Sequence, residues 1–197
     1  MFALLSPSAL AVVLAVLRRR SLVGLLRQRI AWWPLGFFAF GTEVALSSTP
    51  LGQQPFGLAW GSALWLAALI TMAAMLARNA YVRSSAPRWA WALASLGVLL
   101  NIVVVAANDG HMPQSQEARI AAGASIERVA GLASEPGWRN VAPMTPESRL
   151  TWFGDVLPEP AWLPLHNVMS VGDLLLAGGL AMTVYLATIP RGLTRVR

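Results

Sequence analysis

Hydrophobic residues dominate five stretches of the chain, and short polar or charged segments separate these stretches. A transmembrane helix needs about 20 mainly apolar residues, because it crosses roughly 30 Å of hydrocarbon at about 1.5 Å per residue. The last four stretches have about this length. In chain order, the stretches cover residues 2–17, 30–48, 57–77, 88–108 and 171–189. The pattern predicts an all-α fold, a polytopic transmembrane helical bundle with five spans.

The first stretch is the shortest of the five, with 16 residues. No basic residue precedes it, whereas Arg18, Arg19 and Arg20 follow it directly, which reverses the charge order of a signal peptide. We therefore expect a first span with an external N-terminus. If this helix lies flat on the membrane instead, four spans remain and the other loops keep their sides.

The composition supports a membrane protein and argues against several other classes. Hydrophobic residues make up 56% of the chain and charged residues only 12%, whereas charged residues are roughly a quarter of an average soluble domain. A net charge of +6 would suit nucleic-acid binding in a soluble chain. Here the arginines gather beside apolar stretches, so we expect membrane lipids as partners and no nucleic acid. The absence of Cys excludes disulfides and Cys-ligated metal or iron–sulfur sites.

The arginines divide unevenly between the two sides of the predicted membrane. One side holds eleven Arg and no acidic residue, whereas residues 109–167 on the other side hold four Arg and seven acidic residues. Arginine-rich loops stay in the cytoplasm in most multi-pass proteins. The distribution predicts a multi-pass protein of the bacterial plasma (inner) membrane, with its N-terminus outside and its C-terminus in the cytoplasm.

Residues 109–167 form the one long segment between predicted spans, and they carry helix signals of their own. Ser115 and Ser125 are suited to cap short helices. Thr145, followed by Pro146 and Glu147, predicts another helix that Gly154 would end. Four aromatic residues are suited to hold the segment against the bilayer or the bundle: Trp138, Trp152, Phe153 and Trp162. We expect a partly helical external lid within a single integral membrane domain, residues 1–197.

Polar side chains gather toward the external ends of the predicted spans. At about 1.5 Å per residue, Glu43 lies roughly 7 Å below the outer end of its helix, and Asn101 lies roughly 10 Å below the end of its own. An intramembrane acid suggests a functional site, although either side chain could simply hydrogen-bond a neighbouring helix. We predict an outward-facing polar pocket beneath the external lid. Its candidate residues are Glu43, Asn101, Asn108, Asp109, His111, Asp155, Ser170 and Asp173.

Some of these candidates have a structural interpretation as well. Ser170 and Asp173 place a hydroxyl near a carboxylate, but S-x-x-D directly before an apolar run favours a helix-capping box over a catalytic pair. His111 and His166 lie outside the spans and could meet aspartates at a metal ion, yet no recognised metal-binding spacing supports such a site. We therefore expect no metal and no cofactor.

Several short sequence motifs in the second half of the chain occur together, in the same order, in one known protein family. They are Asn101 within the fourth span, the string NxGxMP at 108–113, FGD at 153–155 and SxGD at 170–173. With these strings the chain resembles a family of small bacterial polytopic membrane proteins known only as a domain of unknown function. The family turn usually reads Asn-Gly-Gly, so Asp109 departs from it, and any role that needs a bare backbone there is in doubt. The resemblance implies the membrane-bundle fold and location, and no activity.

The sequence carries no catalytic motif, and the leading hypothesis is therefore a non-enzymatic subunit or scaffold of a membrane complex. Its candidate partners are other membrane-protein subunits or a second copy of the chain. A second hypothesis is a module that binds or transports a small molecule or an ion through the outward-facing pocket. A third is an outer-leaflet enzyme acting on a lipid-linked substrate, in which Asp155, Asp173 and His111 would serve as acid/base or metal-binding groups.

Overall fold

The structure is a computed structural model that describes residues 2–26, 29–82, 87–131, 137–162 and 167–189. It is mostly helical, at 67% helix, with few strands. The prediction of a helical fold is confirmed. The long helices lie at the five predicted stretches: α1 (Phe2–Leu17), α3 (Trp33–Ser48), α4 (Pro55–Tyr81), α5 (Arg88–Ala107) and α8 (Val171–Ala187).

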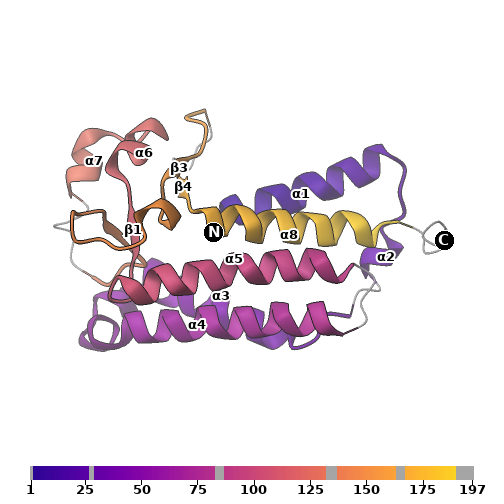
Figure 1. The fold of residues 1–197 in the computed structure, drawn as a ribbon, viewed down its shortest axis with the longest axis horizontal. Coiled ribbons are helices and arrows are strands. Elements are labelled where there is room, and N and C mark those ends of the chain that lie inside the picture. Colours follow the sequence, from indigo (N-terminus) through magenta and orange to yellow (C-terminus); the bar gives the residue numbers. More distant parts are fainter. Residues whose placement is uncertain (1, 27–28, 83–86, 132–136, 163–166, 190–197) are drawn as a thin grey trace.

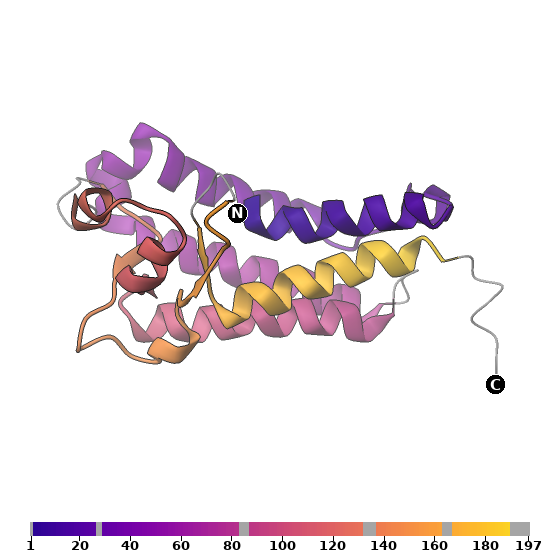
Figure 2. The same cartoon turned by 90° about the horizontal axis from the view of Figure 1, so that it is seen from above.

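Two of the described helices, α4 and α5, are long and apolar enough to cross a membrane. The other three long helices are shorter, with 16 residues in α1, 16 in α3 and 17 in α8. All five run along the long axis of the molecule (Figures 1 and 2). They pack side by side in the order α1, α8, α5, α4, α3. Within the described residues α1 and α3, the two ends of this order, share no extensive contact.

Helices α5 and α8 approach each other closely, and small residues make this approach possible. A Cβ atom added at Gly179 of α8 would lie 2.5 Å from the Ala94 nitrogen and 2.7 Å from the Ala90 oxygen of α5. Gly97 of α5 similarly faces the backbone of Gly172 and Leu176. Small residues let two helix backbones approach, which gains dispersion contacts and brings polar groups on the two helices within hydrogen-bond reach.

The connection between α5 and α8, residues 108–170, folds over one end of the bundle (Figure 1). It contains β1 (Met112–Gln114), α6 (Gln116–Ala121), α7 (Ile126–Gly131), β2 (Val141–Pro143), η2 (Thr151–Phe153), β3 (Leu157–Pro158) and β4 (Val168–Met169). Strands β1 and β2 pair in parallel, and β3 pairs with β4 antiparallel. Ser115 caps α6 as predicted, because its side chain accepts a hydrogen bond from the Ala118 amide at 3.1 Å.

The predicted helix at Thr145 does not form, and the chain makes turns there instead. The Met144 amide donates to the Gln114 carbonyl at 2.9 Å, and the Asn108 side chain bonds both backbone groups of Arg149. These long-range partners hold the backbone on both sides of the turns. A helix of two or three turns has little stability of its own to compete with them. The prediction from the Thr-Pro-Glu signal was wrong for this reason.

Trp138 anchors the connection on the helix bundle. Its indole nitrogen donates to the Ser62 hydroxyl at 3.0 Å, and its ring meets Trp65 edge-on with 5.9 Å between the ring centroids. Gly61 leaves the space for the indole, because a Cβ at that position would overlap the ring. The prediction that Trp138 would dock the segment is therefore confirmed, whereas Trp152 and Trp162 are exposed to 85% and 81%.

The opposite end of the bundle carries the described arginines of the basic set. They lie at the helix ends and short turns there, which include α2 (Val23–Leu26), and are Arg18, Arg19, Arg20, Arg29, Arg78 and Arg88. The remaining short element, η1 (Pro50–Gln53), joins α3 to α4 at the end near the connection. The chain thus separates basic helix ends from an acid-bearing connection along one molecular axis.

Candidate functional site

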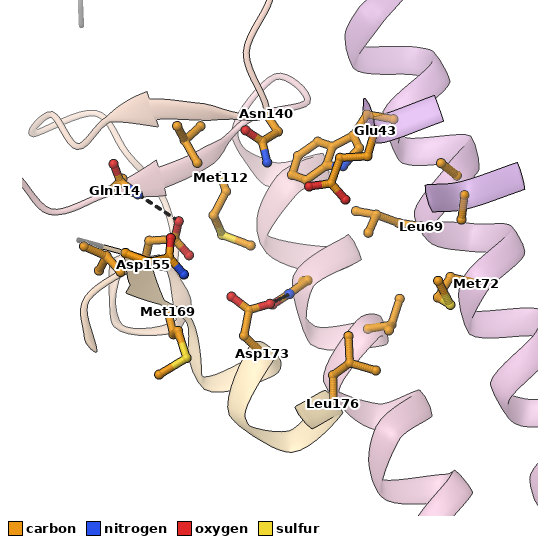
Figure 3. Close-up of a pocket in the computed structure, with 18 of the residues that line it drawn as sticks. Glu43, Leu69, Met72, Met112, Gln114, Asn140, Asp155, Met169, Asp173 and Leu176 are labelled. Carbon is orange, nitrogen blue, oxygen red and sulfur yellow. Dashed lines mark hydrogen bonds between the residues drawn. The ribbon is translucent and has the colours of Figure 1, made fainter. Parts of the chain in front are cut away.

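A cavity of about 300 Å³ lies where the connection meets the ends of α3, α4, α5 and α8 (Figure 3). Its volume is at the lower end of the range of roughly 300–1,000 Å³ that small-molecule sites occupy. Its walls come from helices α3, α4, α5, α6 and α8 and from strands β1, β2 and β4, so residues distant in sequence meet here.

The half of the cavity that lies toward the middle of the bundle is apolar. Phe40 of α3, Leu69 and Met72 of α4, Val98 of α5 and Leu176 of α8 form it. On α4 the lining extends from Trp65 to Met72, which corresponds to roughly 10 Å of helix at about 1.5 Å per residue. This half could accept a hydrocarbon group but offers it no hydrogen bond.

The half beneath the connection is polar and rich in carboxyl groups. Glu43 of α3, Asp173 of α8 and Asp155 of the connection all line it, together with the amides of Asn101 and Gln114. Arg119 of α6 is the basic residue among the described lining residues, and its Nη1 atom donates to Gln114 Oε1 at 2.7 Å. Carboxyl groups therefore outnumber basic groups around the cavity.

Asn101, Ser170 and Asp173 form one hydrogen-bond network that joins α5 to the start of α8. Asn101 Nδ2 donates to Asp173 Oδ1 at 2.8 Å, and the Ser170 hydroxyl donates to Asn101 Oδ1 at 2.9 Å. Asp173 Oδ2 accepts from the Ser170 amide at 3.1 Å, and Ser170 Oγ accepts from the Asp173 amide at 2.9 Å. The predicted capping box is present, and Asn101 extends it across the helix interface.

Asp155 is held in the connection with its side chain only 6% exposed. Its backbone bonds the residues around β1: the Asp155 amide donates to the Pro113 carbonyl and the Ser115 amide donates to the Asp155 carbonyl, both at 2.9 Å. Gln114 Nε2 donates to the carboxyl at 3.2 Å. Burial, reinforced by the charge of Asp173, raises the pKa of Asp155 to about 8, against the smaller opposing effects of Gln114 and Arg119.

Glu43 reaches the cavity from α3 and faces the bundle (Figure 3). In the described part of the chain its carboxyl group has no hydrogen-bond partner, because the bond from Ser47 Oγ goes to the Glu43 backbone carbonyl. Glu43 is thus unlike Asp173, whose two carboxyl oxygens are both engaged.

The other predicted site residues lie in the turn after α5 and do not line the cavity. Asn108 donates to the carbonyls of Val104 and Arg149, at 2.8 and 2.9 Å, and so ends α5 and fixes the connection. Asp109 is exposed in the turn at φ 53°, and the His111 ring packs near Trp138 with 6.2 Å between centroids. The arrangement does not bring His111 together with Asp155 and Asp173.

The described residues include no group of three His, Asp or Glu side chains placed to hold a metal ion. His166, the second histidine considered from the sequence, lies outside the described residues. Four of the eight candidate residues line the cavity: Glu43, Asn101, Asp155 and Asp173. Ser170 does not line it but donates a hydrogen bond to the Asn101 side chain.

Sequence reasoning missed several polar lining residues, chiefly Gln114, Arg119, Asn140 and Asn167. Gln114 lies in β1 and Asn140 directly precedes β2, so the directions of their side chains depend on the pairing of β1 with β2. Arg119 lies in the short helix α6, and Asn167 directly precedes β4. A signal was present for Gln114 alone, as the polar residue that closes the predicted turn string at 108–113.

Comparison with protein families gives one assignment. The model of the family of unknown function DUF5317 matches residues 28–185, which include α3 to α7, most of α8 and every residue of the cavity. Neither the curated proteins nor the solved structures include a match to this chain. The family supplies no activity, but its match covers most of the sequence. The chain therefore belongs to the DUF5317 family.

Proposed function

We propose that this chain is a multi-pass integral membrane protein in which all five long helices span the membrane. Each helix carries large apolar side chains on the outer surface, among them Leu10, Phe37, Leu58, Leu99 and Leu174, each exposed to between 46% and 69%. Lipid tails accept such faces, whereas water disfavours them. Helix α1 packs along α8, which supports five spans over the four-span alternative with α1 flat on the membrane.

In the proposed orientation, the arginine-bearing end faces the cytoplasm of a bacterial cell and the connection lies outside as a lid. The separation of basic and acidic residues along the long axis supports this orientation, because arginine-rich loops stay on the cytoplasmic side. The network that joins Asn101 to Ser170 and Asp173 would hold the lid at the outer ends of the spans.

Thiol labelling tests the orientation directly, because the natural chain has no Cys. We expect Glu147→Cys, in an exposed turn of the connection, to react with a membrane-impermeant maleimide in intact cells. Tyr81→Cys, at the 77% exposed end of α4, should react only after permeabilisation. Labelling of Tyr81→Cys in intact cells, with Glu147→Cys protected, would overturn the proposed sidedness.

Within this topology we infer that the protein is a binding module for a small molecule, in preference to a scaffold without a ligand. The observation that carries the inference is the cavity of about 300 Å³ with one apolar half and one carboxyl-rich half. Binding sites combine an apolar lining with a few polar groups that fix orientation. The Glu43 carboxyl accepts no hydrogen bond from the residues that the structure describes, and this supports a ligand, since a polar group in an apolar setting is costly without a hydrogen bond.

Filling the cavity tests this function, and α4 offers a matched pair of neighbouring alanines. Ala68 lines the cavity and is 2% exposed, whereas Ala67 is exposed and lies outside it. We expect native mass spectrometry of the wild-type protein and of Ala67→Phe to detect a co-purifying small molecule, and Ala68→Phe to lose it. Circular dichroism checks that both variants keep their helix content. The proposal fails if the wild type carries no such molecule, or if folded Ala68→Phe retains it.

A further inference from the structure

The cavity opens at some distance below the outer end of α3. This distance indicates whether a ligand enters from water or from the lipid bilayer. Phe40 lines the cavity and is also 46% exposed, so it stands at the edge of the opening. It lies eight residues before Ser48, the last residue of α3, hence roughly 12 Å below the helix end at about 1.5 Å per residue. In the proposed topology this depth lies within the hydrocarbon of the outer leaflet.

The position of Phe40 agrees with the packing order of the helices. Helices α1 and α3 are the two ends of this order, and the described residues show no extensive contact between them. The cavity is lined by α3 but by no described residue of α1, so Phe40 lies on the side where the order ends. In the proposed topology this side faces the bilayer.

The two halves of the cavity suit different chemical groups of one molecule. The apolar half, with Leu69, Met72 and Leu176, would hold part of a hydrocarbon tail. The polar half presents Glu43, whose carboxyl accepts no hydrogen bond from the described residues, and Asp155, which accepts a single described side-chain bond from Gln114. Carboxyl oxygens accept hydrogen bonds, and a bound cation favours the ionised carboxylate even where burial favours the protonated acid, so a donor that carries positive charge fits them.

We propose that the ligand is a membrane amphiphile with a primary amine head and a hydrocarbon tail, which enters from the outer leaflet beside α3. The inference rests on the proposed function of the cavity and specifies its ligand class. The ammonium group has three donors, and it lies between Glu43 and Asp155 while the tail follows Leu69 and Met72 toward the opening at Phe40. A fatty acid of equal length would bring a negative charge to these carboxyl groups and supply no ammonium donor.

The test compares dodecylamine, dodecanoic acid and butylamine as probes of the full-length protein in maltoside micelles, with affinities from native mass spectrometry titrations. We expect dodecylamine to bind at least about tenfold more tightly than dodecanoic acid, because of the carboxyl groups. Butylamine, which has the head but little tail, should bind at least about a hundredfold more weakly than dodecylamine.

One double variant, with Glu147→Gln as its control, tests whether the carboxyl groups cause the preference for the amine. The double variant Glu43→Gln, Asp155→Asn keeps the shape of both side chains and one acceptor oxygen on each. It removes the negative charge and should lose at least about tenfold in dodecylamine affinity. Glu147→Gln removes an exposed acid of the connection and should leave the affinity unchanged. Equal binding of amine and acid, or an undiminished affinity in the folded double variant, would overturn the amine assignment.

The dodecylamine titrations and the cavity-filling experiment test different proposals, and their results can be told apart. If Ala68→Phe removes a co-purifying molecule while dodecylamine shows no preference over dodecanoic acid, the cavity binds a ligand of another class and only the present inference fails. If Ala68→Phe changes neither the co-purifying molecule nor dodecylamine binding, both proposals fail.

Discussion

Replacing Gly179 by leucine is expected to prevent stable folding, whereas the same replacement at the neighbouring Gly178 is expected to be tolerated. A Cβ atom at Gly179 would lie 2.5 Å from a backbone nitrogen and 2.7 Å from a backbone oxygen of α5, so the two helices would have to separate. Gly178 has no atom within 4 Å of the equivalent position. Overpacking costs about 1–3 kcal/mol where side chains can move, and we expect more than about 3 kcal/mol against a backbone.

The two leucine variants form a matched pair, because they add the same side chain to adjacent residues of α8. We expect Gly178→Leu to purify as a single species in detergent with an unfolding temperature near that of the wild type. Gly179→Leu should aggregate or unfold at a temperature lower by ten degrees or more, on the order expected for a loss of several kcal/mol. Equal unfolding temperatures for the two variants would show that α5 and α8 do not approach each other in this way.

Replacing Asp155 by asparagine is expected to stabilise the protein by an amount that grows with pH. The pKa of Asp155 is raised from 3.8 to about 8, chiefly by burial. Below about pH 4 the carboxyl is protonated in both the folded and the unfolded chain, so it adds no pH dependence. Between about pH 4 and pH 8 the unfolded chain loses the proton and the folded chain keeps it, and the wild type loses stability as pH rises.

The asparagine variant lacks this titration but can still accept the hydrogen bond from Gln114. Its stability relative to the wild type should therefore rise by on the order of 1 kcal/mol per pH unit across that window and level off above about pH 8. Thermal unfolding in detergent at pH 5, 7 and 9 measures the difference. Glu147→Gln is the control: hydrogen bonds from Thr145 and its own backbone lower the pKa of Glu147, so its removal gives no gain at alkaline pH. A constant difference between Asp155→Asn and wild type at all three pH values would contradict the burial of a protonated Asp155.

The helices and their caps were predictable because the forces that form them act over a few residues. Four of the five helix starts fall within two residues of the predicted stretches, and α3 begins three residues later than expected, at Trp33 next to Pro34. Proline is favoured in the first turn of a helix, and it pulls the start toward itself. The capping box of α8 needs only Ser170 and Asp173, three residues apart, so the sequence suffices to place it.

The candidate site was predictable in part. Glu43 and Asn101 were selected only by their distance below the outer ends of their predicted spans, and both line the cavity. Residues at similar depth on different helices of one bundle can meet when the helices pack side by side. Asn108 and His111 were selected from a turn that is close in sequence, yet they hold the connection and contact Trp138 instead. Their side-chain directions follow from the turn geometry at Asp109 and Gly110, which hydropathy does not encode.

The amino-acid sequence by itself determined that this chain forms long apolar helices, where they begin and end to within about four residues, and that basic and acidic residues lie at opposite ends of them. Local hydrogen bonding, hydropathy and charge are sufficient for these features, since each depends on neighbours within one or two helical turns. Only the tertiary structure decided that Gly179 and not Gly178 meets α5, that Asp155 is buried, and that Gln114 shares its cavity. Those features depend on which faces of distant segments come together, and this is set by the packing of the whole chain.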